Sequence, residues 1–95
     1  MTYDEFLQAC SDRTLSNDAD PLLHSLFLDK SGDWDTAHSI AQGIATRDGS
    51  LVHAYLHRKE GDLGNAGYWY SRAGTSAPSV SLAEEWESLA RKYTD

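Results

Sequence analysis

Two histidines one helical turn apart offer the clearest chemistry in this sequence. His53 and His57 are four residues apart and Glu60 follows three residues later, so a helix would place all three side chains on one face. Two imidazoles and a carboxylate can hold a divalent metal ion. The same positions would also pack between the two helices of a hairpin, which gives these histidines a structural interpretation. Residue types alone leave both interpretations open.

Aromatic and basic side chains nearby suggest a binding surface. Successive residues of a helix turn by about 100°, so Tyr68, Trp69 and Tyr70 cannot all face the same way. We expect Tyr70 to be buried and Tyr68 to face outward beside Arg72, where a stacking or cation–π contact is possible. Such a surface could bind a carboxylate or phosphate group, and the alternative is a solvated face with half-buried aromatic rings. The candidate partner-binding residues are His53, His57, Arg58, Lys59, Tyr68, Trp69 and Arg72.

Nucleophilic and phosphate-loop chemistry have little support. Cys10 occupies a core-facing position of an amphipathic segment, where cysteine behaves as a small hydrophobic residue. No serine lies in a GxSxG motif, and the segment GDLGNAG is not followed by the Lys-Ser or Lys-Thr of a phosphate loop. Paired acids stand at predicted helix N-termini, where negative charge is favourable. We therefore expect no catalytic residue and no cofactor, although an enzyme is not ruled out by the sequence.

Helical signals run along the whole chain. Thr2 with Glu5, and Ser81 with Glu84, form capping boxes, and Asp20 precedes a proline at a first helical position. No segment alternates with a period of two residues as a strand would. The segment RDG at 47–49 is predicted to turn the chain. Helices are expected at about 3–11, 21–31, 34–46, 50–60, 63–73 and 81–93.

An internal repeat organises the middle of the chain. Gly-Asp begins at Gly32 and again at Gly61, 29 residues later, and the helices before each copy also align. His24 then matches His53, and a small residue follows in each copy. Helix pairs repeating at such a period are typical of helical solenoids. Since both hairpins use histidine alike, the repeat favours a structural role for His53.

The second copy, GDLGNAGYWYSRAGTSAP, resembles the second half of a tetratricopeptide repeat. In that resemblance Gly61-Asp62 is the turn between helices, Ala54 is the small residue at the close approach, and Pro78 is the terminator. Ala66, Tyr70 and Ala73 would be packing positions. The first copy is looser, with Ala41 in place of an aromatic residue and Gly49 in place of the proline, and the period is shorter than the usual 34.

The resemblance implies an all-α fold and a tendency to bind proteins or peptides, without implying a chemistry. It covers about residues 21–78. The longer string HAYLHRKEGDLGNAGYWYSRAG also resembles a string shared by a group of small uncharacterised bacterial proteins.

Composition and charge exclude several classes of protein. A net charge of −7 argues against nucleic-acid binding, although residues 47–74 hold four basic and three acidic residues. No apolar run approaches the roughly 18 residues of a membrane span. Cys10 is the single cysteine, so no internal disulfide can form, and the N-terminal segment carries acids where a secretory signal carries bases. We expect a cytoplasmic protein.

The sequence thus predicts one all-α domain over residues 1–95. Two tetratricopeptide-like hairpins, at about 21–47 and 50–74, would be flanked by helices at about 3–11 and 81–93. We expect a monomer or homodimer, with the C-terminal helix covering the open end of the hairpins. The predicted function is a protein- or peptide-binding module, and the alternative is a metal or small-molecule binder that uses His53, His57 and Glu60.

Overall fold

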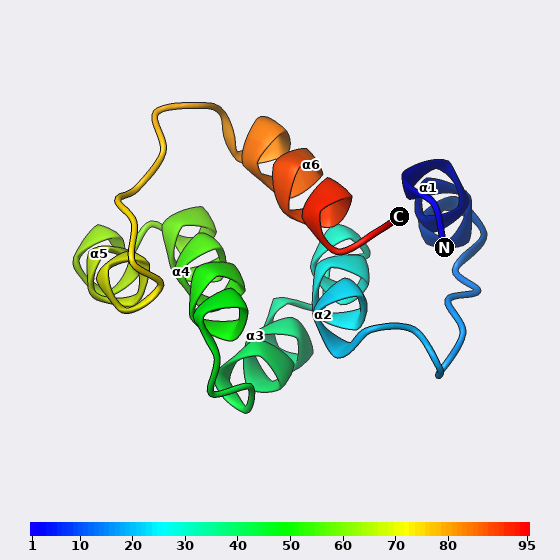
Figure 1. Ribbon diagram of the computed structural model, residues 1–95, viewed down its shortest axis with the longest axis horizontal. Coiled ribbons are helices and arrows are strands. Elements are labelled where there is room, and N and C mark those ends of the chain that lie inside the picture. Colours follow the sequence, from blue (N-terminus) through cyan, green and yellow to red (C-terminus); the bar gives the residue numbers. More distant parts are fainter.

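The computed structural model describes all 95 residues and is entirely helical, which confirms the predicted fold class. Figure 1 shows the helices in chain order. Their bounds are α1 Tyr3–Asp12, α2 Pro21–Lys30, α3 Trp34–Gln42, α4 Arg47–Glu60, α5 Leu63–Arg72 and α6 Leu82–Lys92.

Capping side chains set where these helices begin. The Thr2 and Ser81 hydroxyls accept hydrogen bonds from the backbone N–H groups of Glu5 and Glu84, and both capping boxes are complete. Asp20 caps α2 directly before Pro21. The acids of both Gly-Asp turns cap the helices that follow them, α3 and α5. Local sequence therefore accounts for most helix boundaries.

Helix α4 lies in the middle of the fold. Helix α2 packs against α3, α3 against α4 and α4 against α5, and α6 crosses both α2 and α4 (Figure 1). The two chain ends are close together, because the N-terminal ammonium lies 2.8 Å from an Asp95 carboxylate oxygen. Eight of the 14 residues of α4 are buried, so this helix presents a buried surface to neighbours on more than one side.

The apolar core joins α6 to the hairpins. The Trp86 ring stacks on Phe6 with centroids 5.7 Å apart, and its indole N–H donates to the Leu26 carbonyl at 3.1 Å. Leu89 is buried in the same cluster, so α6 covers the hairpins as the sequence predicted. The twelve buried core residues are Phe6, Leu22, Leu23, Leu26, Ala37, Ala41, Val52, Tyr55, Leu56, Trp86, Leu89 and Ala90.

Helix α4 begins at Arg47, and the prediction that residues 47–49 form a turn is wrong. Thr46 supplies the cap by accepting a hydrogen bond from the Gly49 N–H at 3.0 Å. Gly49 is needed for a steric reason: a Cβ atom there would lie 2.0 Å from the Ile44 carbonyl oxygen. The tight passage from α3 into α4 therefore depends on a missing side chain.

The two hairpins share their close approaches but not their histidines. Ser25 and Ala54 are fully buried, as are Ala37 and Ala66 opposite them. His24, however, contacts the Ser16 carbonyl in the preceding loop at 2.8 Å. His53 lies between helices instead, so the inference that both hairpins use histidine alike is wrong.

The helices are short. None of them is both long and apolar enough to cross a membrane.

We predict that Gly49→Ala destabilises the protein by about 1–3 kcal/mol or more, because overpacking forces the backbone to move. Urea denaturation followed by circular dichroism measures the change. The matched control is Gly67→Ala in the middle of α5, where a Cβ atom meets nothing within 4 Å. That change should stabilise the protein by about 0.5–1 kcal/mol. Equal effects of the two substitutions would contradict this account of the α3–α4 passage.

Candidate functional site

Three histidine rings meet between α3 and α4. The His53 Nε2 atom lies 2.9 Å from the His38 Nε2 atom and 3.0 Å from the His57 Nε2 atom. His53 and His57 are 3% and 6% exposed, while His38 is half-buried. The three ligand atoms lie within 4.8 Å of one another. The structure therefore brings together the two histidines of the sequence motif and adds a third.

Hydrogen bonds between the three rings cannot satisfy all of their Nε2 atoms. A neutral imidazole nitrogen is either a donor with one N–H or an acceptor with one in-plane lone pair. The His53 Nε2 atom therefore makes one well-directed hydrogen bond, yet it has two nitrogen neighbours at close range. Three Nε2 atoms directed at one small region match the needs of a metal ion, which accepts all three lone pairs.

Glu60 contacts the Nδ1 edge of His57 and does not lie between the three histidine rings. Its Oε1 atom lies 2.6 Å from the His57 Nδ1 atom, on the opposite edge of the ring from the other histidines. The carboxylate therefore favours the tautomer that carries its proton on Nδ1 and a lone pair on Nε2. The predicted set of His53, His57 and Glu60 is wrong in this respect, because Glu60 orients a histidine and His38 takes its place.

Two tryptophans support the cluster from either side. Trp34 stacks on His38, with centroids 4.8 Å apart and an angle of 12° between the planes. Trp69 stacks on His53 at 4.1 Å and 28°. The Trp34 indole N–H also donates to the Leu56 carbonyl at 2.8 Å, which holds α3 against α4. The rings are consequently fixed before any ligand arrives.

Burial disfavours the charged forms of His38 and His53. Burial, with the neighbouring rings of His38 and His57, lowers the pKa of His53 to about 4. Burial also lowers the pKa of His38, and the nearby His57 acts in the same direction. Neutral rings keep the lone pairs that a metal requires.

The sequence interpretation missed His38. In the repeat alignment His38 matches Gly67, which has no side chain, so the comparison of the two copies gave no reason to select it. A usable signal was the stacking of successive hairpins, which places the second helix of one hairpin against the first helix of the next. His38 lies on α3 and the other two histidines lie on α4, so that packing brings them together.

Arg58 and Lys59 do not belong to this surface. Arg58 donates to the buried Glu85 carboxylate at 2.7 Å and to the Val80 carbonyl. Lys59 donates to the buried Asp29 carboxylate at 2.8 Å. Both cations of the predicted patch are therefore taken up in ion pairs that join α4 to α6 and α2.

The remaining patch residues lie together on α5. Tyr70 is buried and Tyr68 is 54% exposed, as the helical spacing predicted. Arg72 donates to the Tyr68 hydroxyl at 3.1 Å and lies 5.3 Å from the Trp69 ring. Tyr68, Trp69 and Arg72 thus form a continuous surface beside the histidine cluster.

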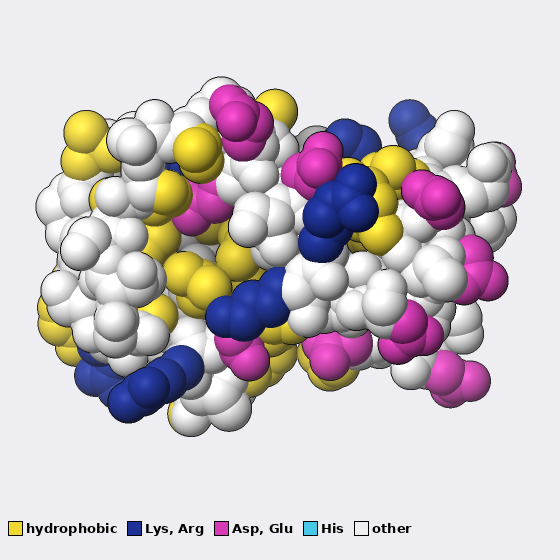
Figure 2. Space-filling view, turned by 45° about the horizontal axis from the view of Figure 1, so that its top comes forward, with side chains coloured by type: hydrophobic (Ala, Val, Ile, Leu, Met, Phe, Trp, Pro, Cys, Tyr) yellow, Lys and Arg dark blue, Asp and Glu magenta, His cyan; other side chains and the backbone are white.

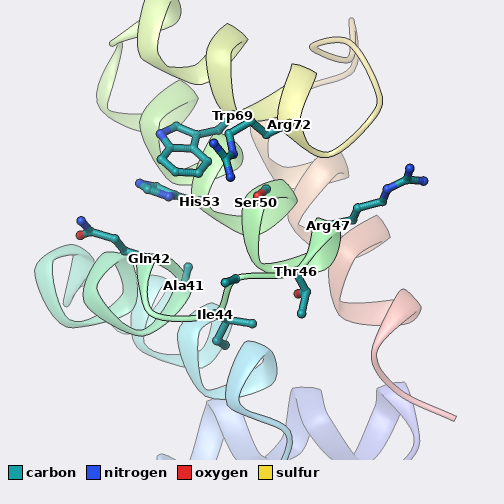
Figure 3. A pocket seen from close by; sticks show the side chains of 10 residues that line it. Ala41, Gln42, Ile44, Thr46, Arg47, Ser50, His53, Trp69 and Arg72 are labelled. Carbon is teal, nitrogen blue, oxygen red and sulfur yellow. The ribbon is translucent and has the colours of Figure 1, made fainter.

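A pocket of about 270 Å³ opens next to this surface, between the end of α3, the start of α4 and α5. Figure 3 shows the Trp69 ring above His53, with the Arg72 guanidinium beside it. The sequence interpretation did not identify this pocket, because it placed residues 47–49 in a turn. Its lining residues are Ala41, Gln42, Ile44, Ala45, Thr46, Arg47, Ser50, His53, Trp69 and Arg72.

We predict that Arg58→Met destabilises the protein by about 3 kcal/mol, because it leaves the buried Glu85 carboxylate without its cation. Chemical denaturation measures the loss. Arg72→Met is the matched control and should change stability by less than about 0.5 kcal/mol, since Arg72 is exposed and forms no ion pair. Equal losses would show that Arg58 has no special structural role.

Comparison with known proteins adds no name to this site. No family model, no curated protein and no solved structure matches the chain. The tetratricopeptide resemblance therefore stays a prediction, and the geometry described above is the basis for a function.

Proposed function

We propose that this protein binds a divalent transition-metal ion through His38, His53 and His57. The observation that carries the proposal is the convergence of three Nε2 atoms on one point. Neutral imidazole is a ligand that suits Zn²⁺, Cu²⁺ and Ni²⁺, whereas Mg²⁺ and Ca²⁺ prefer oxygen. Zn²⁺ is the ion we would test first.

The observed spacing needs only a small adjustment to accommodate such an ion. Zinc binds imidazole nitrogen at about 2.0–2.1 Å, so tetrahedral ligand nitrogens lie roughly 3.3 Å apart. The two Nε2 contacts at His53 are 2.9 and 3.0 Å, which is a few tenths of an ångström shorter. Small ring rotations would open this distance. Three protein ligands also leave a fourth position for water or another ligand.

The protein- or peptide-binding module predicted from the sequence, and its cytoplasmic location, stay predictions. Of the predicted patch, Tyr68, Trp69 and Arg72 remain adjacent on α5. Arg58 and Lys59 are engaged with buried acids, so the surface has fewer free cations than the sequence suggested. The histidine cluster is the more specific feature, and we therefore place metal binding first.

We predict one Zn²⁺ ion per chain, with an affinity that falls at least tenfold in His38→Ala. His38 is the least buried ligand, so the fold should tolerate its loss. Zn²⁺ at about 100 times its dissociation constant should stabilise the wild type by about 2.7 kcal/mol. That corresponds to a rise in Tm of roughly 10–20 °C for a domain of this size. Isothermal titration calorimetry and thermal unfolding measure the two effects.

His24→Ala is the matched control, since His24 contacts a loop carbonyl and lies outside the cluster. This variant should bind Zn²⁺ like the wild type, and Mg²⁺ should bind neither protein. The proposal fails if the wild type does not bind Zn²⁺, or if the His24 and His38 variants lose the same affinity.

We predict that Glu60→Gln weakens Zn²⁺ binding by about tenfold to a hundredfold while the stoichiometry stays at one. The amide cannot stabilise the His57 tautomer as the carboxylate does, although the three ligands remain. A competition titration with a coloured chelator measures the affinity. Unchanged affinity would show that Glu60 does not act on the metal through His57.

A further inference from the structure

The pocket beside the histidine cluster has an unusual charge for this protein. The chain carries 15 acidic and eight basic residues, yet the pocket is lined by two arginines and no acid. Neither Arg47 nor Arg72 forms an ion pair, whereas Arg58, Lys59, Arg91 and Lys92 all do. Arg72 thus brings an unpaired cation to the pocket, whereas the guanidinium of Arg47 points away from it toward Gly74 (Figure 3).

The pocket lies at one end of a helix whose dipole is positive there. Figure 2 shows several acidic side chains over the right half of the molecule and one group of basic side chains at the lower left, with further basic side chains in the centre and at the upper right. The N-terminus of the 14-residue helix α4 also opens at the pocket rim, at Thr46 and Arg47. The positive end of its dipole adds to the charge of Arg72.

Ser50 is an independent sign that the pocket accepts a polar ligand. This residue is only 8% exposed and lines the pocket, and its hydroxyl has no hydrogen-bond partner in the structure. Figure 3 shows that hydroxyl on the side of α4 that faces Trp69 and Arg72. No side-chain N or O atom that is sealed from solvent lacks a partner, so the unpaired Ser50 oxygen is open to the pocket, where a ligand atom can reach it.

We propose that this pocket binds a small molecule through an oxyanion, either a carboxylate or a phosphate. The Arg72 guanidinium has five N–H donors and spends one on Tyr68, which leaves a fork free for two oxygens. The Ser50 hydroxyl donates to the same group. The Trp69 ring and the side chains of Ala41 and Ile44 supply an apolar wall for the rest of the ligand.

The size of the pocket suits a small ligand. The pocket, of about 270 Å³, is large enough for several water molecules. A single aromatic ring with one acidic group is of this order. Inorganic phosphate, benzoate and phenyl phosphate are therefore suitable probes, and they separate phosphate from carboxylate recognition.

The test is an NMR titration of ¹⁵N-labelled protein with each probe at constant ionic strength. Protein dialysed free of metal and chelator is used, so failure of the zinc proposal and failure of this one are distinguishable. We expect at least one probe to shift the backbone N–H signals of Thr46, Arg47 and Ser50 and the indole signal of Trp69. We expect Arg72→Gln to weaken that binding at least tenfold and Ser50→Ala to weaken it about threefold or more.

Arg13→Gln is the matched control, because it removes the same charge from an arginine that also lacks an ion pair and caps the C-terminal end of α1, a helix at the opposite end of the molecule from α5 (Figure 1). It should leave binding unchanged, and Arg72→Lys should retain only part of it because a lysine lacks the planar fork. The proposal is overturned if no probe binds, if the shifts spread over all basic side chains, or if the Arg13 and Arg72 variants behave alike.

Discussion

Helix α4 carries polar side chains into the packed interior, and each of them needs a partner there. Unpaired buried polar groups cost several kcal/mol, and unpaired charges cost more. Tyr55 and Lys59 share the buried carboxylate of Asp29, with contacts of 2.9 and 2.8 Å. Arg58, one residue before Lys59, meets Glu85, which also accepts a hydrogen bond from the Tyr70 hydroxyl at 2.6 Å. These pairings join α2, α5 and α6 to α4, and they determine which basic residues remain free.

The histidines on another side of α4 have no buried acid as a hydrogen-bond partner. No acid enters the space between the three rings, and Glu60 contacts only the outer edge of His57. The rings are left to pair with one another, which one lone pair or proton per nitrogen cannot do completely. Stacking on Trp34 and Trp69 nevertheless holds them in place. A preorganised cluster of imidazole donors is what a metal-binding protein requires, and this contrast with the paired cations is the basis of our functional proposal.

His53 and Trp69 belong to both candidate sites. The His53 Nε2 atom faces the other histidines, while the residue as a whole also lines the pocket with Arg72 and Ser50. Gly49 makes this neighbourhood possible, because only a residue without a side chain lets α4 start directly under Ile44. One steric requirement at the α3–α4 passage therefore sets the shape of the pocket and the position of the cluster beside it.

The sequence by itself determined the six helices, the buried face of α6 and the outward direction of Tyr68. Caps, glycine stops and helical spacing act within a few residues, so they can be identified without knowledge of the rest of the fold. It also indicated where polar chemistry gathers, since two of the three clustered histidines lie in the segment it singled out.

Only the tertiary structure decided which polar side chains meet. His38 is 15 residues from His53, and Arg58 is 27 residues from Glu85, so their contacts depend on how separate helices pack. The same packing moved Arg58 and Lys59 into ion pairs and placed Ser50 at a pocket. A side chain's type and spacing define what it can bind, but its neighbours across helix interfaces define what it does bind, because hydrogen bonds and ion pairs act only over a few ångströms.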